Sequence, residues 1–122
     1  MRLNAAGLIA RRRNLGPGDR VKLVVHVPLS HADVVRQAMG DAGGGKLGEY
    51  SHCTFSVRGI GRYKPSDSAN PFIGQPGEYS SVEEERIEMP VDRSVLSKVI
   101  AAMKKAHPYE EVVYDVIALE NS

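Results

Sequence analysis

The sequence predicts an α+β fold of the ferredoxin-like βαββαβ type, in which a four-stranded antiparallel sheet carries two helices on one face. The 122 residues suffice for one domain with a small core. Strand-like and helix-like patterns follow in the order strand, helix, strand, strand, helix, strand. Right-handed crossovers then place both helices on the same side of the sheet. We assign residues 21–122 to this domain and residues 1–20 to a flexible N-terminal extension.

The first strand and the first helix are predicted from two hydrophobic periods. Residues 21–27 place apolar side chains on every second position, and Pro28 ends the strand. Ser30 and Asp33 have the spacing of a capping box, which predicts a helix over residues 32–42. The apolar stripe of that helix has helical spacing and consists of Val34, Val35, Ala38, Met39 and Ala42.

Two further strands are separated by a long excursion. Residues 46–57 alternate with period two and predict the second strand, on which Cys53 shares the phase of Phe55 and is expected to be buried. Residues 58–81 are rich in Gly, Pro, Ser and Asn, and loops of this length are uncommon unless they are functional or disordered. Residues 82–90 predict the third strand.

The second helix and the last strand complete the order. Asp92 is a candidate cap for a helix that ends near His107-Pro108, because proline disfavours a helical conformation in the residue before it. Its stripe consists of Val95, Leu96, Val99, Ile100 and Met103. Residues 111–119 are apolar on both faces, which is typical of a central or doubly covered strand. We therefore expect the helix-free sheet face to pack against another subunit of a homo-oligomer.

Composition excludes several classes of protein. Lys and Arg number 16 against 15 Asp and Glu, so the charge gives no reason to expect a nucleic-acid or membrane partner. Cys53 is the only cysteine, which excludes an internal disulfide and every zinc motif built on a cysteine pair. No apolar run reaches the roughly 18–20 residues that span a bilayer. We expect a soluble cytoplasmic protein.

Three sequence blocks in order carry a resemblance to a known family. They are "GGGKLGEYSHCTFSVRGIGRYKP", "ANPFIGQPGEYSSVEEERIE" and "HPYEEVVYDVIALEN". Together they resemble the CutA-like and PII-like domain inserted in YqfO-type members of the Nif-three-like family, from about Lys22 to Asn121. The resemblance implies a ferredoxin-like fold and, because CutA relatives assemble as trimers, a homotrimer.

The resemblance also limits the function. The halves that flank this domain in the longer family members carry the His, Asp and Glu residues of a dinuclear metal centre, and the match covers neither half. A hydrolase of the GTP cyclohydrolase type two kind would therefore need a separately encoded metal-centre protein as partner. Glu85 departs from the family pattern, which has an apolar residue there, and this raises a question about the burial and register of the third strand.

The stretch "HPYEE" is the first candidate site. His107, Glu110 and Glu111, completed by Cys53 or His52 from another strand, form a ligand set that suits a divalent metal such as zinc or copper. The alternative is a structural turn in which His107 ends the helix as an imidazolium stabilised by the helix dipole. The sequence favours the turn, while the resemblance to CutA, whose members are linked to divalent-metal tolerance, supports the metal.

The excursion holds the second candidate site. Exposed backbone amides, two arginines and an aromatic ring are a set that holds a small anionic ligand in a cleft between subunits, as the loops of PII-like proteins do. The residues are Arg58, Gly59, Gly61, Arg62, Tyr63 and Asn70. The alternative is a loop that only packs against a neighbouring subunit, and the sequence favours it, because no acid–base pair or nucleophile accompanies these residues.

The sequence favours a non-catalytic, trimeric regulatory or small-ligand-sensing module. A CutA-type divalent-metal-binding protein is the alternative. An enzyme comes third, because no Ser-His-Asp arrangement, acid–base pair at helical spacing or multi-histidine motif supports it.

Overall fold

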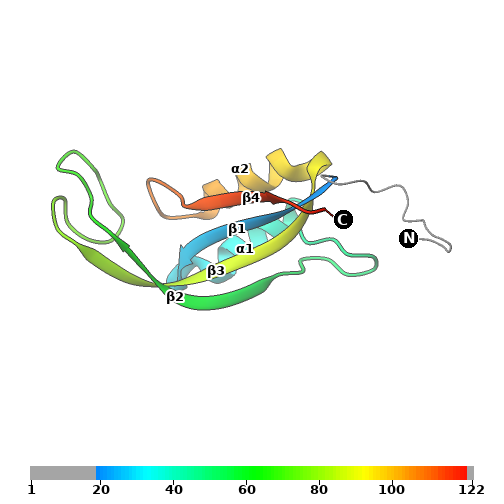
Figure 1. The fold of residues 1–122 in the computed structure, drawn as a ribbon, viewed down its shortest axis with the longest axis horizontal. Coiled ribbons are helices and arrows are strands. Elements are labelled where there is room, and N and C mark those ends of the chain that lie inside the picture. The colour runs from blue at the N-terminus through cyan, green and yellow to red at the C-terminus, as the bar shows by residue number, and fades with distance from the viewer. Residues whose placement is uncertain (1–18, 121–122) are drawn as a thin grey trace.

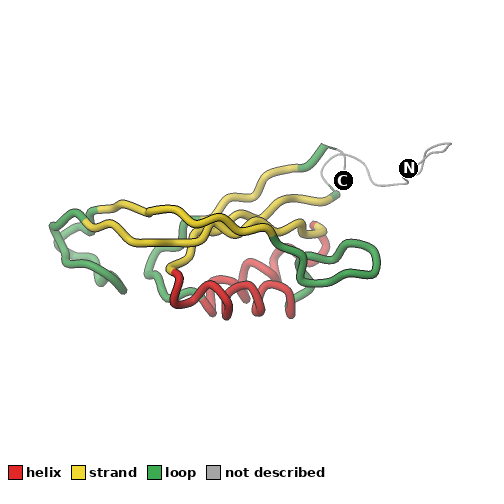
Figure 2. The backbone as a smooth tube through the Cα atoms, turned by 90° about the horizontal axis from the view of Figure 1, so that it is seen from below, coloured by secondary structure: helices red, strands yellow, loops and turns green. Residues whose placement is uncertain are grey.

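The computed structural model describes residues 19–120, so the N-terminal extension, apart from its last two residues, lies outside the described part. The elements are β1 (Arg20–Pro28), α1 (Ala32–Asp41), β2 (Phe55–Tyr63), β3 (Ser80–Asp92), α2 (Leu96–Ala106) and β4 (Tyr114–Ala118). Both helices lie on one side of the sheet (Figure 2), which confirms the predicted βαββαβ fold. Between residues 19 and 120, neither helix is long and apolar enough to cross a membrane.

The sheet has the order β2-β3-β1-β4, and every neighbouring pair is antiparallel. β4 therefore lies at an edge and pairs only with β1, so of the two predicted alternatives, a central or a doubly covered strand, the central strand was wrong. Its apolar residues divide between the faces by alternation: Tyr114 faces the helices, while Val113 and Ile117 lie on the helix-free face and are 55% and 44% exposed.

The core lies between the sheet and the helices. In β1 the alternate residues from Val21 to Val27 are completely buried, as the period-two pattern predicted. The helical stripes supply the facing side chains, and the buried members are Val35, Met39, Val99 and Met103. β3 contributes Ile87, Met89 and Val91 to the same cluster. These side chains fix the sheet against both helices.

The helix starts differ from the predicted caps. Each helix is preceded by one turn of 3-10 helix, Leu29–His31 or Arg93–Val95, and neither helix has a side-chain cap hydrogen bond. The Ser30 hydroxyl contacts His31 Nδ1 at 2.8 Å, and Asp92 pairs with Arg20 at 3.3 Å. Both cap predictions, the Ser30 capping box and the Asp92 cap, were wrong. The extra turn places Ser30 and Asp92 away from the first free amides of the α-helices.

The predicted second strand was misplaced. Residues 46–54 form a loop that contains a Leu47–Tyr50 bridge and a positive φ of 60° at His52. β2 begins only at Phe55 and continues to Tyr63, so the β2–β3 ribbon projects beyond the rest of the sheet and residues 64–79 connect its ends (Figure 1). Cys53, in this loop, is half-buried and not the buried apolar residue expected.

Glu85 keeps its place in the register because α1 supplies a partner. It pairs across the sheet with Val27 on one side and Arg58 on the other. Its carboxylate forms an ion pair with the Arg36 guanidinium, which also pairs with Asp33 on its own helix. The Glu85 carboxylate therefore lies on the helix face of the sheet, at the edge of the core, and the register of β3 is unchanged.

Two adjacent valines on α1 test which face of the helix packs against the sheet. Val35 is fully buried and Val34 is 51% exposed. Val35→Ala should lower the free energy of unfolding by about 2 kcal/mol, because it leaves a cavity in the core. Val34→Ala is the control: it makes the same helical substitution and should stay within roughly 0.5 kcal/mol of the parent. Urea unfolding of both variants checks this, and equal losses would contradict the assigned faces.

Candidate functional site

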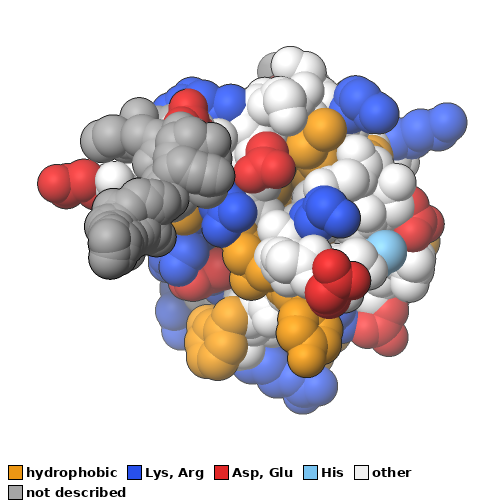
Figure 3. All heavy atoms as spheres, turned by 90° about the vertical axis from the view of Figure 1, so that its right-hand side faces the viewer, with side chains coloured by type: hydrophobic (Ala, Val, Ile, Leu, Met, Phe, Trp, Pro, Cys, Tyr) orange, Lys and Arg blue, Asp and Glu red, His pale blue; other side chains and the backbone are white. Residues whose placement is uncertain are grey.

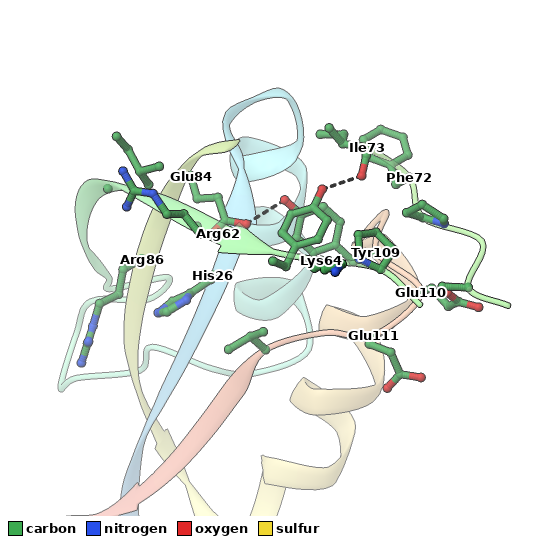
Figure 4. A pocket seen from close by; sticks show the side chains of 18 of the residues that line it. His26, Arg62, Lys64, Phe72, Ile73, Glu84, Arg86, Tyr109, Glu110 and Glu111 are labelled. Atoms are coloured by element: carbon green, nitrogen blue, oxygen red, sulfur yellow. Dashed lines mark hydrogen bonds between the residues drawn. The ribbon is translucent and has the colours of Figure 1, made fainter. Parts of the chain in front are cut away.

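A cavity of about 740 Å³ lies at the end of the sheet from which the β2–β3 ribbon projects. We call it the end cavity. Residues 57–66 form one wall, residues between 69 and 73 form the second, and residues between 109 and 113 form the third (Figure 4). Three strand residues complete the lining: His26, Glu84 and Arg86.

The turn after α2 is held by His107. The residue is 7% exposed. Its Nε2 donates a hydrogen bond to the His26 carbonyl oxygen at 2.7 Å, and Nδ1 accepts one from the Tyr109 backbone N–H at 3.2 Å. Burial lowers the pKa of His107 below its usual value of 6.5. The imidazolium expected at the helix end is therefore wrong: the ring is neutral, and both nitrogens are used within the chain.

Glu84 lies at the floor of the end cavity beneath Tyr109. The Tyr109 hydroxyl donates a hydrogen bond of 2.7 Å to Glu84 Oε2, and the carboxylate-bearing residue is 8% exposed (Figure 4). Burial, this hydrogen bond and the negative charge of Glu84 raise the pKa of Tyr109 well above its usual value. The other carboxylate oxygen lies against Gly61, where an added Cβ would overlap it, so a larger residue at this position would displace the Glu84 carboxylate.

The excursion closes the cavity through aromatic and backbone contacts. The Tyr63 hydroxyl donates to the Ile73 carbonyl oxygen at 2.5 Å, and the ring of Phe72 lies 6.4 Å from that of Tyr109. The Asn70 backbone N–H donates to Glu110 Oε1 at 3.0 Å. These contacts hold residues 64–79 against the turn after α2.

The predicted ligand residues lie in and beside the end cavity, and those on β2 divide between its two faces. All but Asn70 line the end cavity, and Asn70 is tied to Glu110 beside it. The register places Gly59, Gly61 and Tyr63 on the face that carries Glu84, whereas the alternate residues Arg58 and Arg62 project to the other face of β2. Within residues 19–120, neither of these exposed arginines pairs with a carboxylate.

The predicted metal ligands are not brought together in one chain. His107, Glu110 and Glu111 share the turn after α2, but Cys53 lies in the loop at the opposite end of the sheet (Figure 1). His52 beside it contacts Asp41 at 3.0 Å instead. No three His, Cys, Asp or Glu side chains from residue 19 to 120 gather in a metal-binding arrangement. The end that carries this loop shows a mixture of basic, acidic and apolar side chains (Figure 3).

Glu84 is a residue of the site that was not among the predicted candidates. It stands between two other glutamates, and such a run is usually a solvated surface. The alternation of Ile87 and Met89 assigns Glu84 to the helix-free face, but its burial depends on Tyr109, 25 residues away. The available signal was a pair of glycines on β2, Gly59 opposite Glu84 and Gly61 two residues further on, since glycine in a strand often marks a close approach.

Comparison with known proteins agrees with this architecture. No protein-family model matches the chain. A protein of Bacillus subtilis named "GTP cyclohydrolase 1 type 2 homolog" is 52% identical over 101 residues, which are 83% of this chain and 27% of that protein. The chain thus spans only about a quarter of the curated relatives it matches.

This chain also matches solved structures, either a segment of a longer protein or a whole domain of similar size. A Bacillus cereus protein related to NIF3 matches with a TM-score of 0.74 and 47% identity, over 87% of this chain and 27% of that one. The PII-like protein CutA from Nostoc matches with a TM-score of 0.60 and 18% identity over 83% and 82% of the two chains, which shows the fold alone.

The buried His107 should make stability depend on pH. Its pKa in the unfolded chain is near 6.5 and is lower in the folded protein, so below about pH 6.5 the unfolded chain binds a proton that the folded one excludes. The free energy of unfolding should therefore fall as the pH drops from 6.5 towards the folded pKa and then level off. His107→Gln removes this contribution. Urea unfolding at about pH 7 and about pH 5.5 measures it, and an equal pH dependence in parent and variant would contradict a neutral His107.

Proposed function

Because the chain is homologous to the segment that makes up about 27% of the proteins named GTP cyclohydrolase 1 type 2 homolog and has a CutA/PII-like fold, we propose that it is a non-catalytic regulatory module. It senses a small anionic ligand in the end cavity. The cyclohydrolase of the relatives' name is assigned to no residue here.

The observation that carries this proposal is the combination of a cavity with unpaired cations. A volume of about 740 Å³ lies within the range of small-molecule sites, roughly 300–1,000 Å³. Arg58 and Arg62 are exposed at its margin, and no carboxylate between residues 19 and 120 pairs with them. Guanidinium groups bind phosphate and carboxylate groups through paired N–H donors. The exposed glycine backbone beside them admits a ligand closely.

The proposed assembly is a homotrimer that uses the helix-free face and the excursion. Apolar side chains at both margins of that face are exposed in the single chain: Phe55 and Val57 on β2, and Val113 and Ile117 beside and on β4. The proposed ligand is an anion at the margin of the end cavity, which Arg58 and Arg62 line, in a cleft completed by a neighbouring subunit.

Light scattering tests the assembly. The parent protein should have the mass of a trimer at micromolar concentration. Val57→Glu places a charge at the margin of the proposed interface and should shift the protein towards monomer, because an unpaired charge is costly to bury. Val34→Glu, on the exposed face of α1, is the matched control and should leave the mass unchanged. A monomeric parent would refute the trimer.

Substitution of the arginines tests the ligand. Arg58→Ala and Arg62→Ala should each leave the melting temperature nearly unchanged, since neither side chain has a partner in the described chain. Each should weaken the binding of pyrophosphate, used as a probe, about tenfold or more, which is the usual loss for a charge-assisted hydrogen bond. Lys98→Ala, an exposed cation on α2, is the control. Calorimetric titrations that give equal affinities for all four proteins would exclude these arginines from the site.

A further inference from the structure

The floor of the end cavity carries a buried carboxylate with one unused oxygen. Glu84 is 8% exposed, and its Oε2 accepts the hydrogen bond from Tyr109. Its Oε1 lies against Gly61, and the structure of residues 19–120 gives that oxygen no hydrogen bond and no ion pair. A buried carboxylate is unfavourable unless a cation or several donors satisfy it.

Between residues 19 and 120, no Lys, Arg or His side chain forms an ion pair with this carboxylate. Tyr63 and Tyr109 are neutral phenols, and the charge of Glu84 helps to raise the pKa of both. His107 is neutral, because burial lowers its pKa and both of its nitrogens already have partners. Arg86, which follows on the same face of β3, pairs with Glu88 at 3.1 Å. Lys64, another cation of the cavity lining, lies over the ring of Tyr79. The negative charge of Glu84 therefore has no ion-paired cation within the described residues.

Aromatic rings surround the same position. The ring centroids of Tyr63 and Tyr109 lie 6.5 Å apart, and that of Phe72 lies 6.4 Å from Tyr109. In the close-up the rings of Tyr109 and Phe72 lie on the side to which the Glu84 carboxylate points (Figure 4). Aromatic faces attract organic cations, and the attraction grows when the cation is removed from water. A carboxylate among aromatic rings is thus suited to a substituted ammonium group.

We propose that the floor of the end cavity binds the ammonium group of a small amine-bearing ligand. The ammonium donates a hydrogen bond to Glu84 Oε1, and the rings of Tyr63, Phe72 and Tyr109 contact its carbon frame. This assignment rests on the proposed function, because it uses the same cavity as the anion bound by Arg58 and Arg62. The two ends together define the ligand class as a zwitterion, with an ammonium at the floor and an anionic group at the margin.

A purely structural role for the Glu84–Tyr109 hydrogen bond is the competing explanation. Glu84→Gln separates the two, because the glutamine side-chain oxygen still accepts the Tyr109 hydroxyl while the charge is lost. If the carboxylate serves only as a structural clip, the variant binds ligands as the parent does. If the carboxylate holds an ammonium, the variant folds and loses that affinity.

The experiment compares two probes of equal shape by nuclear magnetic resonance titration. 2-Phenylethylamine carries the ammonium, and 2-phenylethanol replaces it with a neutral hydroxyl. The amine should shift the amide resonances of Gly61 and Tyr109 in the parent and bind about tenfold or more tightly than the alcohol. Glu84→Gln should abolish this preference. An amine that binds no better than the alcohol to the parent would overturn the proposal, whether or not the variant folds.

Pyrophosphate titrations of the same samples separate this proposal from the proposed function. Glu84→Gln should bind pyrophosphate at least as well as the parent, since it removes a negative charge from the cavity. Arg62→Ala should lose pyrophosphate affinity and keep its preference for the amine. Amine binding without pyrophosphate binding would refute the anionic-ligand function and leave the ammonium site standing, and the reverse result would refute the ammonium site alone.

Discussion

The hydrogen bond from His107 Nε2 to the carbonyl oxygen of His26 organises the end of the sheet on which the candidate site depends. β4 pairs with β1 from Ala118 to Tyr114, and the last backbone bond between these segments joins the His26 N–H to the Val113 carbonyl oxygen at 3.1 Å. The residues before Val113 no longer pair with β1. The carbonyl oxygen of His26 would therefore have no backbone N–H donor. The imidazole of His107 supplies this donor, so a side chain takes the place of a backbone N–H from a neighbouring strand.

The position of Tyr109 follows from that bond. Pro108 excludes a further helical turn, and His107 takes an extended conformation, with φ −81° and ψ 137°. His107 Nδ1 then accepts the Tyr109 N–H, which directs the phenol over Glu84. Glu84 in turn needs the space left by Gly61. The stretch "HPYEE" is thus a turn that joins helix, strand and excursion, and the end cavity results from this sequence of contacts.

Local sequence patterns predicted the fold but only part of the site. The stripes that contain Val35 and Val99 fixed the helices, because burial at helical spacing depends on the helix itself. Alternation failed for residues 46–54, since a polar loop with glycines mimics period two over a short span. The burial of Glu84 and Glu85 could not be read from local alternation, because their partners, Tyr109 and Arg36, are brought near only by the tertiary fold.

The state of the His107 imidazole tests this account most directly. Nitrogen-detected magnetic resonance of the labelled ring distinguishes the two neutral tautomers from the imidazolium. The two hydrogen bonds of His107 predict the neutral tautomer with the proton on Nε2 at neutral pH. They also predict the same resonances after zinc is added, because neither nitrogen is free to bind a metal. An imidazolium, a proton on Nδ1, or a zinc-dependent change at this ring would contradict it and return "HPYEE" to consideration as a metal site.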